Sequence, residues 1–352
     1  MSYADGMAAI KLEFSDRVPR TEYSVEMHYE LMSKVTGIQV APDSPPELLN
    51  KVRAIFRKEW SLDFAWNVLV SRQYLKGPTS YMGHAVYQAD ASDYNTNTYT
   101  AFNSPQSVYK IDMFDLYGTI DHKTMVDEFN SHYRNACNYF TDMVNMTGIY
   151  ITCISGMIDM FGWEMLLLAL GEDPVAFGEF TNRYANWIQQ HYNALADCEA
   201  DVVMVHDDMV WTEGAFAHPA WYRKYVFPNY KKFWSPLVEA GKKVIFCSDG
   251  TFTEFIDDLV DCGAQGFVLE PTTDIQYIAD HYGKTHVIVG NADTRILLDG
   301  SKEDIYNEVK RCMDIGKKYP GFFMAVGNHI PANTPVDNAL WYNECYEKMS
   351  RR

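Results

Sequence analysis

Short apolar runs rich in β-branched residues alternate with amphipathic stretches through the second half of the chain. A short apolar run bounded by turn residues predicts a buried strand, and apolar positions that repeat every three to four residues predict a helix. This alternation is typical of βα units around a parallel sheet. The pattern predicts strands at residues 201–205, 243–246, 266–269, 286–289 and 322–326.

Helices are predicted around these strands, at residues 46–59, 123–145, 174–196, 219–240, 253–262, 274–281 and 302–318, with a closing helix after Pro335. The first half predicts two further strands, at residues 61–69 and 149–155, and a long polar loop at residues 89–103 that is a candidate lid. Many βα units in a short stretch, without a Gly-rich phosphate loop after the first, favour a closed barrel over a dinucleotide-binding sheet.

The charge balance excludes one class of function. The chain carries 30 Lys and Arg against 47 Asp and Glu, a net charge of −17 with neutral histidines. It therefore lacks the basic surface that nucleic-acid binding requires. Hydrophobic residues make up 47% of the chain and charged residues 22%, a globular composition that excludes a mainly disordered protein.

Three features concern the cellular compartment. The N-terminal segment lacks the basic start and apolar run of a signal peptide, so we expect a cytoplasmic protein without a membrane partner. The apolar stretch 149–170 has the length of a membrane span but contains Asp159 and Glu164, and we predict a buried strand that leads into a helix. Seven scattered cysteines without a CxxC pair indicate buried free thiols rather than disulfides or a zinc finger.

Polar side chains follow five predicted strands, and the carboxyl ends of strands are where a βα barrel carries its chemistry. These residues are His206-Asp207-Asp208, Cys247-Ser248-Asp249, Glu270, Asn291 with Asp293, and Asn328-His329. Helix capping is the alternative interpretation of Ser248 and Asp293, because Ser and Asp commonly cap helices at such junctions. Since groups able to bind metals or protons recur at five strand ends, the set as a whole indicates an active site.

Cys247, Asp249 and His329 can bind zinc, which accepts thiolate, carboxylate and imidazole ligands. Cys247 and Asp249 are two residues apart, on the same side of an extended strand, and His329 follows the last strand. A packed cysteine, a loop carboxylate and a hydrogen-bonded histidine are the alternative interpretation.

His206, Asp207 and Glu270 are candidates for catalytic acids or further ligands, with structural hydrogen bonding as the alternative. The chain contains no GxSxG, P-loop or HExxH motif, so nucleophilic hydrolase, NTPase and zincin interpretations have no support.

Aromatic residues are abundant, with 24 Tyr and 8 Trp. Trp66, Tyr81 and Trp211 lie near the predicted rim of the barrel. Core packing is the ordinary role of any single aromatic side chain, but together these suit a pocket for a flat or apolar substrate.

The ordered strand-end segments resemble the uroporphyrinogen decarboxylase superfamily, which includes cobalamin-dependent methyltransferases. The segments are Asp16-Arg-Val-Pro19, Leu62-Asp63-Phe64, Met82-Gly83-His84, His206-Asp-Asp-Met209, Thr212-Glu-Gly214, Ile245-Phe-Cys-Ser-Asp-Gly250, Glu270-Pro271, Gly290-Asn291 and Gly327-Asn-His-Ile-Pro-Ala-Asn-Thr-Pro335. The resemblance implies an α/β fold with one (β/α)8 TIM barrel over residues 1–352, an N-terminal extension and long βα loops. We expect His84 and Asn291 to bind substrate together with Trp66, Tyr81 and Trp211.

The superfamily contains decarboxylases and methyltransferases, and two features favour the methyltransferases. The decarboxylases carry an Arg-rich, Gly-containing segment near the N-terminus that binds substrate carboxylates, which residues 17–27 of this chain lack. A net charge of −17 also does not attract a polyanion. The resemblance therefore implies an O-demethylase type of enzyme that moves a methyl group from a small methylated substrate, such as an O-methyl aryl ether, to a corrinoid carried by a separate corrinoid-binding protein.

The methyltransferases commonly bind zinc through a His-x-Cys pair and a Cys on the last strand. In this chain Cys247 and Asp249 replace the pair, and Asn328 with His329 stands at the last-strand position. Two interpretations follow, a changed zinc site or a metal-free site that uses proton donors. A divergent decarboxylase and a non-catalytic corrinoid-partner protein are the alternative functions, and a homodimer is left open as the assembly.

Overall fold

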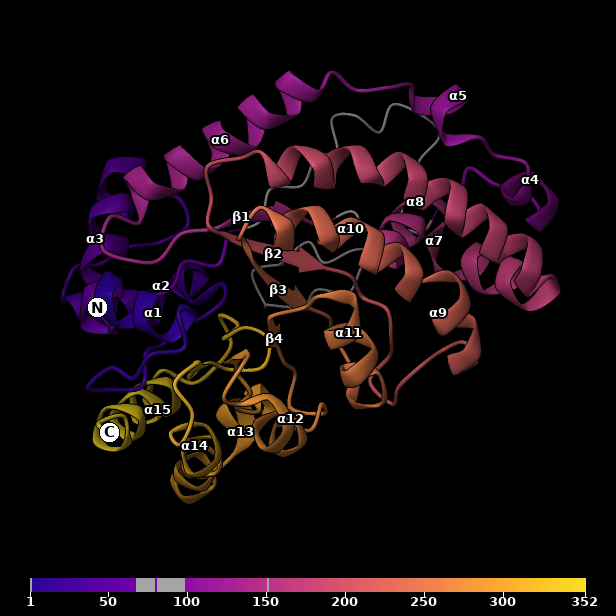
Figure 1. Cartoon of the computed structure of the whole chain (residues 1–352). Helices are drawn as coiled ribbons and strands as arrows, with labels where there is room; N and C mark the ends of the chain where they lie inside the picture. The colour runs from indigo at the N-terminus through magenta and orange to yellow at the C-terminus, as the bar shows by residue number, and fades with distance from the viewer. Residues whose placement is uncertain (1, 68–79, 81–98, 151) are drawn as a thin grey trace.

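A parallel sheet surrounded by helices lies at the centre of the molecule (Figure 1). The computed structural model describes residues 2–67, 80, 99–150 and 152–352. Its strands are β1 (Thr147–Ile149), β2 (Val202–His206), β3 (Lys243–Cys247), β4 (Gly266–Val268), β5 (Val287–Val289) and β6 (Phe322–Phe323). Neighbouring strands follow the order of the sequence, and every pair is parallel. The chain therefore has the predicted α/β fold with a parallel sheet.

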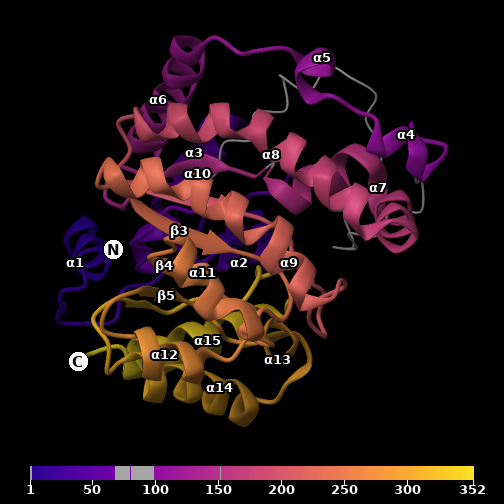
Figure 2. The same ribbon diagram turned by 45° about the vertical axis from the view of Figure 1, so that its right-hand side comes forward.

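Helices return the chain from the end of each strand to the start of the next, as parallel pairing requires. They are α1 (Tyr3–Ile10), η1 (Val25–Met27), α2 (Tyr29–Thr36), α3 (Pro46–Glu59), α4 (Pro105–Tyr109), α5 (Met113–Tyr117), α6 (His122–Tyr139), α7 (Cys153–Glu172), α8 (Pro174–Ala196), α9 (Pro219–Tyr225), α10 (Phe227–Glu239), η3 (Thr253–Phe255), α11 (Ile256–Cys262), α12 (Ile275–Tyr282), α13 (Thr294–Asp299), α14 (Lys302–Gly316) and α15 (Val336–Met349). Figure 2 shows α10, α11 and α12 following one another along the outside of the sheet.

Both faces of the sheet are buried, and alternate residues of a strand point to opposite faces. One face carries a cluster, here called the inner cluster, that includes Met204 of β2, Ile245 of β3 and Ile10 of α1. The other face packs against the surrounding helices through residues such as Val203 and Phe246. Burial on both faces explains why the strands are continuous apolar runs in the sequence.

Backbone hydrogen bonds extend beyond β1 and β6 through two segments near the N-terminus. The Thr21 N–H donates to the Met324 carbonyl (3.1 Å), just after β6. The Asp63 N–H donates to the Arg20 carbonyl (2.8 Å), and the Asp63 carbonyl accepts from the Val144 N–H (2.8 Å), just before β1. Segments 19–21 and 63–65 thereby connect the two outer strands of the sheet.

Helix predictions from the sequence are largely confirmed. Residues 46–59 and 174–196 form α3 and α8 with the predicted bounds. The predicted helix 219–240 is two helices, α9 and α10, that meet at Val226. Pro228 accounts for the break, because it has no N–H to continue the hydrogen bonding of the first helix.

Strand predictions in the first half are less accurate. The predicted strand 149–155 is wrong in position, since β1 ends at Ile149 and α7 begins at Cys153. An apolar run alone does not separate a buried strand from a buried helix. Within the predicted strand 61–69, Phe64 makes one isolated parallel bridge to Val144, and residues 68–69 lie outside the described residues. Residues 89–98 of the predicted polar loop also lie outside them.

Helix α7 is the only one in the described parts of the chain that is long and apolar enough to cross a membrane. Of its most apolar window, 72% is buried inside the protein. The helix kinks at Gly162, whose φ of +74° favours glycine. This burial identifies α7 as a core helix and is compatible with a soluble protein.

A buried ion pair connects the N-terminal segment to the last helix. The Arg20 Nε donates to Glu22 at 2.8 Å, and neither side chain is exposed. The guanidinium carbon lies 4.5 Å from the Trp60 ring centroid, 4.9 Å from that of Tyr342 and 4.7 Å from that of Tyr346, in cation–π contact. Because Tyr342 and Tyr346 belong to α15, this cluster ties the two ends of the chain together.

Replacing Arg20 by alanine should strongly destabilise the protein. The change leaves Glu22 buried without its counter-charge, and breaking a buried pair in this way costs about 3–5 kcal/mol of unfolding free energy. Urea denaturation measures the loss. As a control, Lys123→Ala removes an exposed ion pair with Asp127 and should leave the unfolding free energy nearly unchanged. Equal stability of the Arg20→Ala variant and the wild type would contradict this role.

The stability of the fold should also fall in mild acid, through His191 of α8. Burial lowers the pKa of His191 from 6.5 to about 4. Its neutral form is therefore favoured in the folded state, and the stability that depends on it decreases as the pH falls from about 6.5 towards about 4. We expect roughly 2 kcal/mol of unfolding free energy to be lost between about pH 7.5 and about pH 5.

Urea denaturation at the two pH values tests this expectation. His191→Gln should show a clearly smaller difference between them, because glutamine does not titrate. The same substitution at the exposed His122 should keep the pH dependence of the wild type. An unchanged dependence in His191→Gln would assign the acid sensitivity to other groups.

Candidate functional site

Strands β2 and β3 end side by side, and their last residues, His206 and Cys247, are partners in the parallel register. His206 is in phase with Met204, which belongs to the inner cluster, and Cys247 is itself a member of that cluster. Asp208 and Asp249 each follow two residues later, which returns their side chains to the same side if the chain stays extended. The two strand ends thus bring four polar groups to one place.

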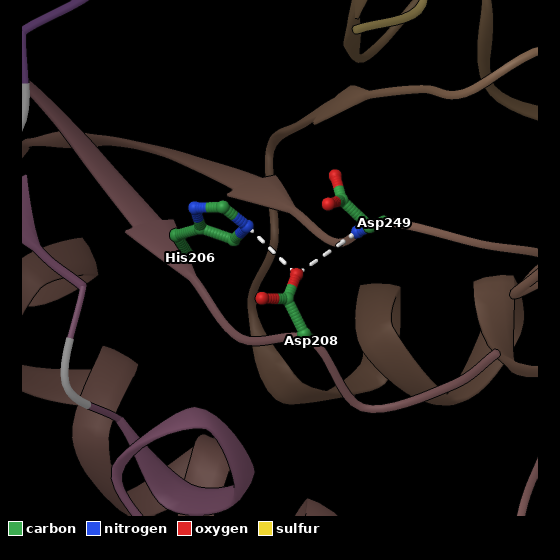
Figure 3. A group of neighbouring side chains, drawn as sticks. All are labelled: His206, Asp208 and Asp249. Carbon is green, nitrogen blue, oxygen red and sulfur yellow. Dashed lines mark hydrogen bonds and ion pairs between the residues drawn. The ribbon is translucent and has the colours of Figure 1, made fainter. Parts of the chain in front are cut away.

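Three of these residues lie together, with the His206 ring facing the Asp208 carboxylate and the Asp249 backbone N–H directed at the same carboxylate (Figure 3). The His206 Nε2 lies 2.8 Å from Asp208 Oδ1, and the Asp249 N–H donates to the same oxygen at 3.1 Å. One ligand atom from each of His206, Asp208 and Asp249 lies within 4.8 Å of the others. Imidazole and carboxylate groups are ligands of zinc and other first-row divalent metals, so this donor set fits such an ion.

Tyr150, just after β1, supports the pair. Its hydroxyl donates to Asp208 Oδ2 at 3.2 Å, and its ring centroid lies 4.3 Å from that of His206 in an edge-to-face contact. The hydrogen bond and the ring contact hold both side chains in their orientations. Residues following three neighbouring strands therefore contribute to one cluster.

The charges in this cluster alter each other's ionisation. Burial opposes ionisation of Asp208, but His206 outweighs it and lowers the pKa of Asp208 to about 2. Burial by itself lowers the pKa of His206, whereas Cys247 and Asp208 raise it, and the net direction is upward. Asp249 is exposed at its edge, yet loss of hydration, followed by repulsion from Asp208, raises its pKa to about 7. Burial also raises the pKa of the Cys247 thiol.

Glu270, which follows β4, connects the β3 loop to the residues after β6. Its Oε2 accepts from the Gly250 N–H (2.8 Å), and its Oε1 accepts from Asn328 Nδ2 (2.8 Å). Asn328 in turn hydrogen-bonds to His329. His329 lies beside this network and does not belong to the group formed by His206, Asp208 and Asp249.

Asp207 and Asn291 have structural partners. The buried Asp207 carboxylate accepts from the Ile154 and Ser155 N–H groups at the start of α7 and from the Tyr230 hydroxyl, so it caps that helix. The buried Asn291 amide donates to the Glu270 and Thr273 carbonyls. Both side chains lie apart from the His206 cluster. Strand alternation explains this for Asp207, because it follows Val203 and Val205 on the face that packs against the helices.

Aromatic side chains lie at two places around the strand ends. Trp66 packs on Tyr23 with ring centroids 5.6 Å apart, and Tyr23 lies 6.5 Å from His329. Trp211, which is 48% exposed, packs on Trp163 with ring centroids 5.7 Å apart. Two further residues predicted to bind substrate, Tyr81 and His84, lie outside the described residues.

Asp208 was among the strand-end residues predicted from the sequence but had no assigned role, and Tyr150 was not among them. The signal for Asp208 was its spacing of two residues from His206, which places the two on the same side of the strand. The signal for Tyr150 was weaker, because the predicted strand at 149–155 ran past the true end of β1 at Ile149. Tyr150 could be found as a site residue only with the strand end known.

The chain belongs to the uroporphyrinogen decarboxylase (URO-D) family, whose model matches residues 108–349. A uroporphyrinogen decarboxylase of Syntrophotalea carbinolica is 25% identical over 178 residues, 51% of this chain and 50% of the relative. That of Carboxydothermus hydrogenoformans is 28% identical over 213 residues, 59% of each chain. The chain thus spans about half the length of the first of these curated relatives and somewhat more of the second.

A solved structure, a methyltransferase from Methanosarcina mazei, is similar over nearly the full length. The similarity covers 98% of each chain with a TM-score of 0.61 and 17% sequence identity. At this identity the similarity is one of fold. The chain is therefore a URO-D superfamily member, as the strand-end segments indicated. It shares its α/β architecture with a methyltransferase.

Gly250 should be the most sensitive glycine of the site. Its φ is +83°, and a Cβ at this position would lie 2.4 Å from the Trp211 carbonyl oxygen. We expect Gly250→Ala to lower the unfolding free energy by about 1–3 kcal/mol through backbone strain, with a further loss from displacement of the loop after β2. Urea denaturation measures the effect.

Gly37 provides the matched control. Its φ is +70°, but nothing lies within 4 Å of an added Cβ, so Gly37→Ala reports the cost of the backbone conformation alone. Gly250→Ala should be clearly less stable than Gly37→Ala. Equal losses would show that the close approach to Trp211 has no energetic consequence.

Proposed function

We propose that the protein transfers a methyl group from a small methylated substrate, such as an O-methyl aryl ether, to a corrinoid held by a separate corrinoid-binding protein. The support is the URO-D family membership, the fold shared with a methyltransferase and, above all, the acidic strand-end site. A neutral or cationic methylated compound is compatible with that site.

The negative charge of the site argues against a substrate with several carboxylates. Asp208 and Asp249 lie beside the His206 imidazole, and Glu270 is near Asp249. Within residues 2–67, 80, 99–150 and 152–352, no ion pair joins these carboxylates to a lysine or arginine. Because like charges repel strongly where hydration is reduced, a substrate with several carboxylates is disfavoured here.

The arginines near the N-terminus are used inside the protein. Arg20 is fully buried against Glu22. Arg17 pairs with Asp63 at 2.5 Å and with Asp5 at 3.2 Å. Neither guanidinium is therefore free to bind substrate carboxylates, which supports methyl transfer over porphyrinogen decarboxylation.

In the proposed reaction the bond between the methyl carbon and its oxygen or nitrogen breaks, and a carbon–cobalt bond forms. The reduced cobalt supplies the electron pair of the new bond. The leaving heteroatom keeps the electron pair of the broken bond and takes a proton. His206 holds a proton between its Nε2 and Asp208, and we assign it as the acid that serves the leaving atom. Glu270 positions the β3 loop and Asn328 around the same space.

Aromatic side chains would form the walls of the substrate pocket. Trp66 follows segment 63–65, and the half-exposed Trp211 follows β2. Flat apolar surfaces suit an aryl ether. Tyr81 and His84 are kept as proposed substrate contacts on the basis of the sequence.

We further propose that the sheet closes into a single-domain (β/α)8 barrel in the cytoplasm. The hydrogen bonds of segments 19–21 and 63–65 support closure, because with β1 to β6 they make a ring of eight neighbouring segments. In a barrel of this kind the active site lies at the carboxyl ends of the strands, where His206 and its partners are found.

A decarboxylase is the second candidate function, because the curated relatives carry that name. It differs from methyl transfer in its products. Carbon dioxide would be released without any corrinoid, and no methylated corrinoid would form.

Methyl transfer is tested with the full chain, a reduced corrinoid protein or free reduced cobalamin, and a panel of aryl methyl ethers and methylamines. The wild type should form methylcobalt species, detected by their absorbance. His206→Gln should lower the rate by about 10²-fold or more, the usual contribution of a positioned acid. Asp280→Asn, on an exposed position of α12, is the control and should retain full activity.

No methyl transfer from any donor by a folded wild type, together with release of carbon dioxide from a carboxylate substrate, would replace this proposal by the decarboxylase. Absence of both activities would favour a non-catalytic partner of corrinoid proteins.

A further inference from the structure

We infer that His206, Asp208 and Asp249 form a binding site for one first-row divalent cation of the zinc class. The site is built from the ends of β2 and β3 alone. This inference goes beyond the proposed methyl transfer and does not depend on it. In the metal-bound chain His206 would be a ligand, and the ion would activate the leaving atom in place of the His206 proton.

The donor atoms lie close enough together to be gathered around one ion. A ligand atom from each of the three residues lies within 4.8 Å of the other two, and bonds of about 2.0–2.2 Å to a central ion place ligand atoms at separations below this limit. One imidazole and two carboxylates make a mixed nitrogen and oxygen set. To bind one ion with the other two groups, the Asp249 carboxylate would turn towards Asp208, which its backbone N–H faces in this structure (Figure 3).

The charges at the strand ends favour a cation. Two carboxylates of the set, with Glu270 near Asp249, face a single histidine. In the described parts of the chain, no residue is found to donate a hydrogen bond to the Asp249 carboxylate, whose backbone N–H is the group that bonds to Asp208. A divalent ion would neutralise this excess of negative charge, as bound ions do where they are the largest local charge.

Neighbouring groups hold the ligands in place. The Tyr150 hydroxyl donates to the second oxygen of Asp208 and its ring contacts the imidazole edge. On the inner side, the Cys247 thiol hydrogen-bonds to His206. Such outer partners orient metal ligands and contribute to affinity.

This ligand set differs from the one expected from the sequence. Cys247, Asp249 and His329 share only Asp249 with it. Cys247 faces the inner cluster as a partner of His206, and His329 is hydrogen-bonded to Asn328. A ligand set without thiolate is chemically harder than a His-x-Cys pair completed by a cysteine of the last strand. It therefore suits Lewis-acid activation of an oxygen more than activation of a thiol.

Metal binding is tested by titrating the chelator-treated full chain with Zn²⁺ in a calorimeter, followed by elemental analysis after dialysis. The wild type should bind one ion per chain. Asp208→Asn and His206→Gln should each weaken binding by at least about tenfold. Cys247→Ser, which alters only a partner of His206, should weaken binding less than either ligand variant, and His329→Gln should bind as the wild type does. Asp280→Asn is the control for loss of a carboxylate elsewhere on the surface.

A Co²⁺ spectrum of the wild type gives a second readout that needs no variant. Cobalt bound by His206, Asp208 and Asp249 should show visible bands without a thiolate-to-cobalt charge-transfer band, because no sulfur ligates it. Circular dichroism of each variant without metal checks that it is folded.

Two results would overturn the inference. One is the lack of stoichiometric Zn²⁺ binding by the folded wild type, which would make His206 and Asp208 a metal-free ion pair. The other is a thiolate charge-transfer band together with loss of binding in Cys247→Ser, which would restore the set with Cys247 and His329. Zinc binding without methyl transfer would support this site and reject the proposed function. Methyl transfer without zinc binding would support the proposed function and reject this site.

Discussion

The alternation of side chains along strands that are buried on both faces is the constraint on which this structure depends. It sends Met204 and Cys247 to the inner cluster and Val203 to the layer of helices. At the end of β2 the same period of two places His206 and Asp208 at the candidate site and turns Asp207 outward to cap α7. Of these three consecutive polar residues, His206 and Asp208 thus belong to the candidate site, whereas Asp207 has a structural role.

Charged groups that lose hydration in this fold have nearby partners that offset the loss. Arg20 is buried, and it is stabilised there by Glu22 and by three aromatic rings that replace part of its hydration. Acidic groups collect at the carboxyl ends of the strands, where Asp208 and Asp249 also lose hydration and, among the described residues, have only His206 as a nearby cation. The stability of the fold and the chemistry of the site therefore depend on separate sets of charged residues.

Hydrogen bonds connect the loops that carry the site to one another, in addition to the pairing between their strands. Gly250 passes so close to the Trp211 carbonyl that only a residue without a Cβ fits, and its N–H is held by Glu270. Glu270 also binds Asn328, so the ends of β3, β4 and β6 are coupled. Such coupling keeps ligand and proton-donor groups at defined separations, which precise chemistry requires.

Much of the architecture followed from the sequence because apolar periodicity and proline positions act locally. The bounds of α3 and α8 and the places of β2 and β3 were predicted, and the ordered strand-end segments indicated the family. Only the tertiary structure decided which polar groups meet. Asp208 rather than Asp207 joins His206, and His329 lies beside Asn328 instead of with Asp249. The reason is physical: strand phase is local, whereas distances between strand ends depend on register and loop paths that residues far apart in the chain determine together.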